Sequence, residues 1–224
     1  MNRLEDLGTE LNGRHYTAAM ADRYNAVLLF GAPGVGKGTQ GKLLGQIPGM
    51  KHLATGDMFR AMDKNSELGR KIGGYMSRGE LVPDDLTIEL WKHYVQGLIR
   101  DKKFSPKHDV LVLDGIPRSR NQAQAIDPYI NVLRIVHLTA PDIDDMVRRM
   151  KKRALKENRP DDANESVIRR RFEVYQAETR PVLAHYDRKL ISDVNAIGTP
   201  AAVLMHTLEA IVPVYDKYCG NPLE

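Results

Sequence analysis

Short apolar runs alternate along the chain with longer segments in which apolar residues recur at helical spacing. Runs of this length and composition predict β-strands, and the segments between them predict helices. Strands that alternate with helices are typical of right-handed crossovers and of a parallel sheet covered on both faces. We therefore predict an α/β fold with strands at residues 26–30, 110–113, 133–138 and 190–194, and a weaker strand near 51–55.

Two segments in the C-terminal half carry the clearest helical pattern. In both, apolar residues recur mostly at intervals of three or four, which places them on one helical face. The two stripes are Ile143, Val147, Met150 and Ala154, and then Val167, Ile168, Phe172 and Tyr175. Each helix therefore has one face for the core and one for charged residues.

The size and composition of the chain fit one folded unit. It has 224 residues, of which 42% are hydrophobic and 28% charged, values close to those of folded globular proteins. A chain of this length supports one sizeable core with small inserted subdomains. We expect an N-terminal extension at residues 1–24, a core at 25–212 and a C-terminal tail at 213–224.

Some functional classes are disfavoured by the sequence. No apolar run approaches the roughly 18 residues needed to cross a bilayer, so no membrane association is expected. The N-terminus carries Glu5, Asp6 and Glu10 and lacks an apolar signal-peptide core, which makes the cytoplasm the expected location. The single cysteine, Cys219, can form no internal disulfide, and the seven histidines show no metal-ligand spacing with it. No structural zinc is therefore expected.

Positive charge is concentrated in one segment of the chain. Residues 148–171 contain ten Lys or Arg and four acidic residues, a net charge of +6. The whole chain is +4, so the other 200 residues together carry −2. This concentration suits a compact polyanion such as a nucleotide polyphosphate, although a solvated helical face is the alternative for any basic run.

A glycine-rich loop follows the first predicted strand. Residues 31–40 read Gly-Ala-Pro-Gly-Val-Gly-Lys-Gly-Thr-Gln and lead into a helical segment. Glycines let the backbone curl with its N–H groups inward, the helix N-terminus adds its dipole, and Lys37 adds a positive charge. The order of strand, loop and helix predicts a phosphate-binding loop rather than an ordinary turn. Thr39 stands one position later than in the usual pattern, because Gly38 follows the lysine.

Polar residues follow another predicted strand, where ligands of open α/β sheets collect. The run at 110–113 ends in Asp114-Gly115-Ile116-Pro117-Arg118. A carboxylate at this position can orient the water shell of a magnesium ion, and Arg118 can reach a second phosphate. Taken alone, Asp114 is also a common turn former, and Arg118 a common surface residue.

Further arginines are candidates for the same anion. Thr55 or Asp57 can cap a helix that carries Arg60, which taken alone is also consistent with a solvated residue. Arg149 and Arg153 stand four apart and share a helical face beside an apolar stripe. An arginine near an inward face needs an anionic partner, because burying it unpaired is costly. Arg159 and Arg171 complete the set, whereas the charges assigned to solvent are Arg148, Lys151, Lys152, Arg169 and Arg170.

Taken together, these motifs closely resemble the adenylate kinase family in order and spacing. The matching segments are the loop at 31–40, Thr55-Gly56-Asp57-Met58-Phe59-Arg60, Leu81-Val82-Pro83-Asp84 and Asp114-Gly115-Ile116-Pro117-Arg118, with Arg149, Arg153, Arg159 and Arg171. The resemblance runs from about residue 26 to 212. It implies a three-layer P-loop kinase fold with a five-stranded parallel sheet, a helical NMP-binding insert at about 54–86 and a short lid at about 154–163.

The resemblance also implies a role for individual positions. ATP would contact Gly34, Val35, Gly36, Lys37, Gly38, Thr39, Arg149, Arg153 and Gly198. AMP would contact Thr55, Arg60, Glu80, Leu81, Val82, Gly115, Arg118, Gln122, Arg159 and Arg171. The catalytic charges would be Lys37, Arg118, Arg149, Arg153, Arg159 and Arg171, with Mg²⁺ held chiefly through water near Thr39 and Asp114.

Several positions refine this expectation. Related UMP/CMP kinases usually have Ala and Asn at the positions of Thr55 and Gln122, so the chain favours AMP as the acceptor. Only five residues separate Arg153 from Arg159, which leaves no room for a long lid or for the zinc site that some family members carry there. Ile116 replaces the usual Phe, Ser119 the usual Thr, and Ala163 is one extra residue before Arg171.

The resemblance thus implies Mg-dependent, reversible phosphoryl transfer from ATP to AMP by a monomer, with two hinged lids that expel water. Three alternatives stay open: a kinase for another nucleoside monophosphate, a non-catalytic nucleotide sensor, and a nucleic-acid-binding ATPase. Retention of every arginine argues against the sensor. No aromatic stacking platform supports the third alternative, so no nucleic-acid partner is expected.

Overall fold

The structure is a computed structural model that describes residues 23–157, 159, 162 and 164–218. Its centre is a parallel sheet of five strands in the order β2-β3-β1-β4-β5. The strands are β1 (Tyr24–Phe30), β2 (Met50–Ala54), β3 (Val110–Asp114), β4 (Ile130–Thr139) and β5 (Ile191–Asn195). The predicted α/β fold with a five-stranded parallel sheet is therefore confirmed, with β4 longer than its apolar run indicated.

Alternation along the central strand explains why both faces of the sheet are covered. In β1, Val27 and Leu29 belong to one buried cluster, whereas Ala26, Leu28 and Phe30 belong to a second cluster on the opposite face. Strands buried on both sides read as continuous apolar runs, which is the pattern of this segment. The middle strand thus holds the two halves of the core together and ends at the glycine-rich loop.

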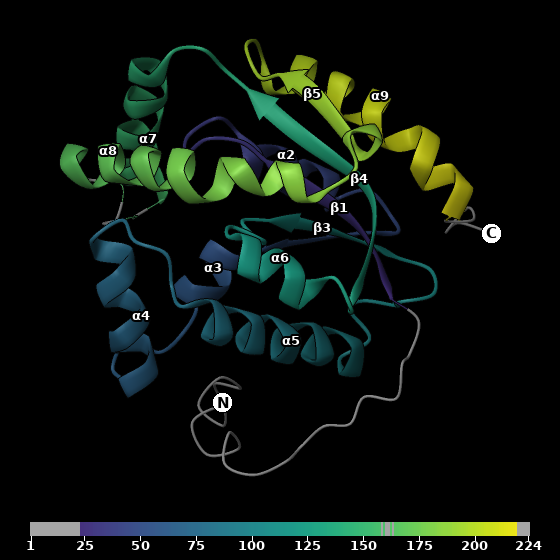
Figure 1. Cartoon of the computed structure of the whole chain (residues 1–224), viewed down its shortest axis with the longest axis horizontal. Helices are drawn as coiled ribbons and strands as arrows, with labels where there is room; N and C mark the ends of the chain where they lie inside the picture. The colour runs from purple at the N-terminus through teal and green to yellow at the C-terminus, as the bar shows by residue number, and fades with distance from the viewer. Residues whose placement is uncertain (1–22, 158, 160–161, 163, 219–224) are drawn as a thin grey trace.

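One face of the sheet is covered by helices from both ends of the chain (Figure 1). They are α2 (Lys37–Leu44), α7 (Ile143–Glu157), α8 (Glu165–Val174) and α9 (Pro200–Tyr218). Most of both predicted helical stripes is confirmed, because Met150 of α7 and Ile168 of α8 are fully buried in the cluster on this face. Ile143, at the start of α7, is exposed instead, and Val167 is only partly buried. The boundary predicted after residue 212 falls inside α9, where buried Tyr215 donates to the carbonyl of Pro48 at 3.1 Å.

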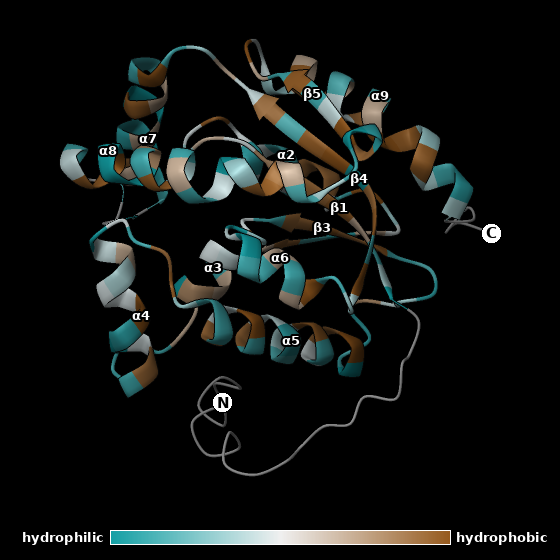
Figure 2. Ribbon diagram, in the orientation of Figure 1, coloured by the Kyte–Doolittle hydropathy of each residue, from teal (hydrophilic) through white to brown (hydrophobic). Residues whose placement is uncertain are grey.

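The other face is covered by α5 (Asp84–Arg100), α6 (Arg120–Ile126) and the short helix η3 (Arg180–His185). Trp91 of α5 is almost completely buried against the sheet. Figure 2 shows the resulting contrast, with mainly hydrophobic strands and mixed hydrophobic and hydrophilic colouring along α5. The chain therefore forms three layers, and the described helices include none long and apolar enough to cross a membrane.

A small insert follows β2 and has a core of its own. It contains α3 (Thr55–Arg60) and α4 (Glu67–Ser77), which pack on the start of α5 through a cluster of Met58, Met62, Ile72, Val82 and Leu90. Neither Thr55 nor Asp57 caps α3, because the helix begins at Thr55 itself and makes no side-chain cap. Their side chains turn to other partners, described below. Because this cluster is separate from the two clusters on the sheet, the insert is a subdomain with its own packing.

The chain between α8 and β5 is tightly wound. A π-helical turn, η2 (Tyr175–Thr179), continues α8, and a 3₁₀ turn, η4 (Arg188–Leu190), precedes β5. Thr179 in η2 donates from its hydroxyl to the carbonyl of Arg118 at 2.9 Å. Because π-helical turns widen a helix locally, they often reposition side chains at functional sites. Here the turn ties α8 to the loop that follows β3.

Candidate active site

The glycine-rich loop joins β1 to α2 at the carboxyl edge of the sheet. Gly31, Gly34 and Gly36 have φ angles of 142°, 78° and 118°, a region that residues with a side chain rarely adopt. Gly36 is the N-cap of α2, and no side chain occupies the helix end. The N–H groups of the first helical turn are thus left for a ligand, and the helix dipole favours an anion there.

Lys37 lies at the first position of α2 and is folded back over the loop. Its Nζ donates to the carbonyl of Gly31 at 2.6 Å and to that of Ala32 at 3.0 Å. Burial lowers the pKa of the Lys37 ammonium to about 8, with Asp114 opposing this change and Arg118 adding to it. A buried ammonium with few compensating charges has a strong preference for an anionic ligand.

The end of β3 contributes the loop that faces Lys37. Gly115 has a φ of 83°, and a Cβ on it would lie 2.6 Å from Nη2 of Arg118 and 2.8 Å from Oγ1 of Thr55. Both neighbours donate a hydrogen bond to the carbonyl of Gly115, Nε of Arg118 at 2.8 Å and Oγ1 of Thr55 at 2.8 Å. Only a glycine fits here, and the shared carbonyl fixes Arg118 against α3.

Asp114, at the tip of β3, faces α2. Its Oδ2 lies 4.0 Å from Nε2 of His52, whose ring packs against α2 so closely that a Cβ on Gly41 would lie 2.2 Å from that nitrogen. Burial lowers the pKa of His52, and Asp114 opposes this effect. The carboxylate of Asp114 lies beside the phosphate loop, where a Cβ on Gly38 would be 3.6 Å from its Oδ2. Carboxylate and hydroxyl oxygens suit Mg²⁺, and both Asp114 and Thr39 are of this kind.

Two adjoining cavities open at this edge of the sheet. The larger, with about 980 Å³ of empty space, lies between the insert, the loop after β3 and the η2 turn. The smaller, with about 560 Å³, lies between the glycine-rich loop, α3 and the basic end of α7. Six residues line both cavities, namely Pro33, Lys37, Gly56, Arg60, Arg118 and Arg171. The boundary between the cavities is therefore strongly cationic.

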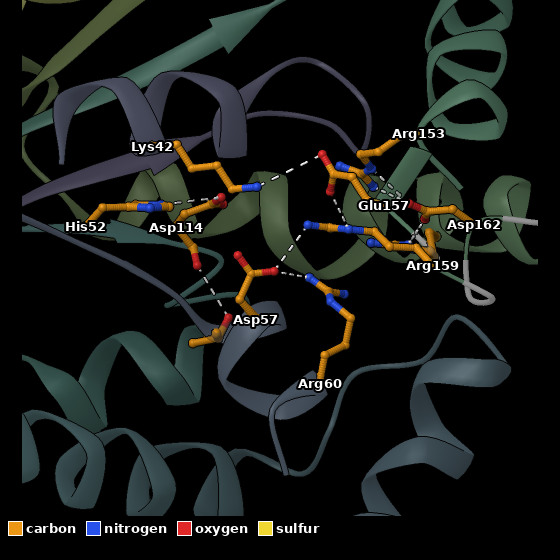
Figure 3. A network of polar contacts seen from close by, with 11 residues as sticks. Lys42, His52, Asp57, Arg60, Asp114, Arg153, Glu157, Arg159 and Asp162 are labelled. Atoms are coloured by element: carbon orange, nitrogen blue, oxygen red, sulfur yellow. Dashed lines mark hydrogen bonds and ion pairs between the residues drawn. The ribbon is translucent and has the colours of Figure 1, made fainter. Parts of the chain in front are cut away.

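Asp57 links two of the arginines around the smaller cavity, as Figure 3 shows. Its Oδ1 accepts from Nη2 of Arg60 at 2.6 Å and from Nη2 of Arg159 at 3.1 Å. Burial raises the pKa of Asp57, but the hydrogen bond from Arg60 and the charges of Arg60 and Arg159 outweigh it and hold the pKa below its usual range. The carboxylate of Asp57 thus lies between the guanidinium groups of Arg60 and Arg159.

Asp162 holds a second pair of arginines. Its side chain is completely buried, Oδ2 accepts from Nε of Arg153 at 2.9 Å, and Oδ1 accepts from Nη1 of Arg171. A fully buried carboxylate is stable only when it is paired and hydrogen-bonded. Asp162 therefore fixes α7 and α8 relative to each other at the point where both reach the smaller cavity.

Most residues predicted to contact ATP lie around the smaller cavity. Its lining includes Gly34, Gly36, Lys37, Gly38 and Arg153. Four others lie outside both linings: Val35 is buried in the core, and Thr39 lies within α2. Arg149 pairs with Asp145 at 2.7 Å, and Gly198 lies in the turn between β5 and α9. The ATP contacts assigned to all nine residues stay predictions.

The residues predicted to contact AMP gather around the larger cavity. Its lining includes Arg60, Glu80, Leu81, Val82, Gly115, Arg118, Gln122 and Arg171. Thr55 is buried beneath this set, Arg159 lies on the smaller cavity, and Glu80 pairs with Arg78 at 2.8 Å. The charges assigned to solvent (Arg148, Lys151, Lys152, Arg169 and Arg170) are exposed as predicted.

Sequence reasoning missed several polar residues beside these cavities. They are His52, Asp84, Glu157, Asp162 and Thr179, each of which contacts a predicted site residue or its loop. No local pattern identifies their contacts, because the sequence does not show which residue each one meets. Three carried a partial signal: Asp84 ends the motif Leu81-Val82-Pro83-Asp84, and Glu157 and Asp162 are acidic residues inside the basic segment. The described residues include no group of three or more His, Cys, Asp or Glu placed to hold a metal, and Cys219 lies outside them.

The fold and the loop define the class of protein: a P-loop protein whose parallel sheet carries its ligand cavities at the carboxyl ends of the strands. The family model for adenylate kinase matches residues 29–191. The chain is 38% identical over 185 residues to an adenylate kinase of Thermus thermophilus, covering 80% of this chain and 92% of that protein. It is 34% identical over 192 residues to an adenylate kinase of Thermobifida fusca, covering 83% and 97%.

A third relative, an adenylate kinase of Flavobacterium psychrophilum, is 35% identical over 192 residues, covering 83% of this chain and 97% of the relative. The chain belongs to the adenylate kinase family. It is accordingly an enzyme of the nucleoside monophosphate kinase class. The resemblance stated from its motifs is thereby confirmed.

Proposed function

We propose that the chain transfers the terminal phosphoryl group of ATP to AMP, reversibly, giving two molecules of ADP. One observation carries the proposal: two cavities adjoin, and the wall they share contains Lys37, Arg60, Arg118 and Arg171. Two nucleotides that enter from opposite ends bring their phosphate chains together at this wall. A cavity for a single nucleotide needs no such shared boundary.

Charge compensation is the chemistry that this wall supplies. Phosphoryl transfer passes through a loose transition state that spreads negative charge over the equatorial oxygens and requires in-line positioning. The positive groups that line the cavities and compensate this charge are Lys37, Arg60, Arg118, Arg153, Arg159 and Arg171. Arg149, paired with Asp145 outside both linings, would join them when the donor binds. No general base is needed, because the acceptor phosphate is already an anion.

When substrate binds, the acidic partners of these arginines release their hydrogen bonds to them. Asp57 and Asp162 accept hydrogen bonds from Arg60, Arg153, Arg159 and Arg171. Phosphate oxygens can take over these hydrogen bonds, so binding exchanges one set of charge-assisted bonds for another. The exchange keeps the cationic groups placed before the substrates arrive and reduces the reorganisation needed on binding.

Mg²⁺ is the cofactor of the proposed reaction, held chiefly through water near Thr39 and Asp114. Asp114 lines the smaller cavity beside Lys37 and Gly38, which supports this assignment. When bound, the ion neutralises charge on the donor's phosphates. The chain's own part is to keep a carboxylate and a hydroxyl next to the phosphate loop.

Closure of two segments completes the proposal. The insert at about 54–86 and the lid at about 154–163 carry residues on opposite sides of the smaller cavity, and the Arg159–Asp57 contact joins them. Closing them over bound nucleotides excludes water that would otherwise hydrolyse ATP. We further propose that the enzyme acts as a monomer in the cytoplasm, without a nucleic-acid or membrane partner.

A coupled assay tests the proposal. Purified chain, ATP and Mg²⁺ are combined with AMP, UMP, CMP or GMP in turn, and ADP formation is followed. We expect the highest kcat/KM with AMP and loss of activity when EDTA removes the metal. ADP formation fastest with another monophosphate identifies a different acceptor. Nucleotide binding without any ADP formation identifies a sensor, and salt-sensitive DNA or RNA binding identifies the third alternative.

A further inference from the structure

Gln122 has both ends of its side-chain amide held by the protein. It lies on α6, is almost completely buried and lines the larger cavity. Its Nε2 donates to Oδ1 of Asp84 at 2.7 Å, and its Oε1 accepts from the backbone N–H of Arg118 at 2.8 Å. The amide is therefore held by hydrogen bonds to two elements, the start of α5 and the loop after β3.

These two partners permit only one orientation of the amide. An Asp carboxylate can only accept a hydrogen bond, and a backbone N–H can only donate one. If the Gln122 amide were flipped, its oxygen would face the carboxylate of Asp84 and its NH₂ group would face the N–H of Arg118. Both contacts would then be repulsive, so the orientation follows from chemistry rather than from the placement of similar atoms.

Asp84 is itself held in place by a second donor. Its Oδ2 accepts from the hydroxyl of Ser119 at 2.8 Å, and Ser119 is the N-cap of α6, with its oxygen accepting from the backbone N–H of Gln122 at 3.0 Å. The two oxygens of one carboxylate thus fix a side chain and a helix end together. Gln122 and its helix are positioned as one unit.

The amide of Gln122 keeps capacity for one further hydrogen bond at each end. Nε2 carries two hydrogens and Oε1 two lone pairs, and Asp84 and Arg118 use one of each. A base that offers an amino group beside a ring-nitrogen acceptor complements this pair: its amino group donates to Oε1 and its ring nitrogen accepts from Nε2. A base with a carbonyl beside a ring N–H presents the reverse pattern.

We propose that Asp84 is the positioning residue that makes the acceptor site read a 6-aminopurine and reject a 6-oxopurine. The inference rests on the proposed function and deepens it, because it assigns the discrimination to a residue that itself need not touch the nucleotide. Asp84 fixes which end of the Gln122 amide donates, and the fixed amide then selects the edge of the base.

The test compares AMP with IMP, which differ only in having an amino group or a carbonyl at C6 and in the proton on N1. In wild-type enzyme we expect a strong preference for AMP in kcat/KM. Asp84→Ala removes one of the two contacts that orient the amide and leaves only the N–H of Arg118, so we expect the AMP/IMP ratio to fall about tenfold, the loss of roughly one oriented hydrogen bond. The change should lie mainly in KM for the monophosphate.

Two controls separate orientation from packing. CMP offers the same pattern of amino group and ring acceptor as AMP, so Asp84→Ala should leave the AMP/CMP ratio within about threefold of wild type, since both depend on the same hydrogen bonds. Asp85→Ala removes the exposed neighbour in the same helical turn and should change neither ratio. Asp84→Asn retains an oxygen that accepts from Gln122 and should retain most of the selectivity for AMP over IMP.

Equal losses with AMP and IMP in Asp84→Ala overturn the inference, and so does an Asp84→Asn variant as unselective as Asp84→Ala. If Asp84→Ala does not fold, the wild-type enzyme still tests the orientation of the Gln122 amide on which the inference depends. Purine riboside 5′-monophosphate has hydrogen at C6 and retains the N1 acceptor, so it should rank between AMP and IMP; a rank at or below IMP contradicts the inference. Absence of AMP phosphorylation by wild type would instead refute the proposed function.

Discussion

Arg159 of the lid segment donates to Asp57 of helix α3 at 3.1 Å, across 102 residues of sequence. The contact joins two elements that cover the smaller cavity from opposite sides, while Nε of Arg159 pairs with Glu157 at 2.7 Å. The carboxylate of Asp57 also accepts from Arg60. One acidic side chain thus brings together two of the arginines assigned to the acceptor phosphate.

Asp57→Asn should loosen this contact in the nucleotide-free protein. Asp57 is 45% exposed, so the ion pair contributes only about 0.2–1 kcal/mol, and amide hydrogen exchange at the end of α7 should rise by no more than several-fold. Asp63→Asn, in the same insert but bonded only within its own turn, serves as the control. Unchanged exchange in Asp57→Asn would show that the contact does not restrain the lid segment.

Arg171→Ala and Arg170→Ala form a matched pair on α8. Arg171 lines both cavities, so its loss should lower kcat by about 10²- to 10³-fold, the effect of removing one group that stabilises transition-state charge. Arg170 is exposed and pairs with Glu173, and its loss should change kcat less than about twofold. Steady-state kinetics at saturating ATP and AMP measure both. A loss in Arg170→Ala comparable with that in Arg171→Ala would mean that the register of this helix has been assigned wrongly.

Activity should depend on the protonation of Lys37. Its pKa is lowered to about 8, and the ammonium is charged below that pH, so kcat/KM for ATP should fall as pH rises above about 8. Bound phosphates stabilise the ammonium, so the corresponding fall in kcat should lie at higher pH. Lys37→Met should remove this dependence and lower kcat/KM by about 10²- to 10³-fold. Exposed Lys42 supplies the control, since Lys42→Met should keep the wild-type profile.

Asp162→Ala should destabilise the protein. It leaves Arg153 and Arg171 without the carboxylate they share, which costs about 3–5 kcal/mol for a fully buried pair. Because these arginines are 29% and 21% exposed, we expect a smaller loss of about 1–3 kcal/mol in the free energy of unfolding. Denaturant titration measures it. Asp144→Ala breaks an exposed pair with Arg169 and should change the free energy of unfolding by less than about 0.5 kcal/mol. An equal effect of the two substitutions would show that the buried ion pairs of Asp162 do not stabilise the fold.

Asp114→Asn should raise the Mg²⁺ concentration that gives half-maximal activity by about tenfold, because it removes the charge that we propose orients the water shell of the ion. Magnesium titrations at fixed ATP and AMP provide the measurement. Asp193→Asn, on β5, is the control, because Asp193 is bonded to His137 and Arg188 and lines neither cavity. An unaltered magnesium requirement in Asp114→Asn would remove Asp114 from the metal site.

The sequence predicted the fold well because the decisive patterns are local. Four apolar runs and one weaker run correspond to the five strands, and the glycine-rich loop is contiguous, so its shape follows from neighbouring residues. The start of β4 was missed because Asn131 interrupts its apolar run, yet Asn131 pairs with Asn25 of β1 and donates to its side chain. Hydrogen bonding to neighbours extended the strand beyond what hydropathy indicated.

The predicted site was incomplete for a different reason. Asp84 contacts Gln122 across 38 residues, and Arg153 contacts Asp162 across 9. An acidic residue taken alone in the sequence is interpreted as a turn former or a helix cap, because the sequence does not show which residue it contacts. Family resemblance supplied the cationic residues, whereas the carboxylates that position them emerged only from three-dimensional contacts.

Helix α2 packs closely against β2 because Gly41 and Gly45 have no side chains. A methyl group at Gly41 would meet the ring of His52, and one at Gly45 would come within 2.8 Å of the Cβ of the same histidine. A larger residue at either glycine would push the helix, and the loop at its start, away from β2. Variation at positions 41, 45 and 52 should therefore be correlated among related sequences. A residue larger than glycine at position 41 or 45 should occur only together with a residue smaller than histidine at position 52.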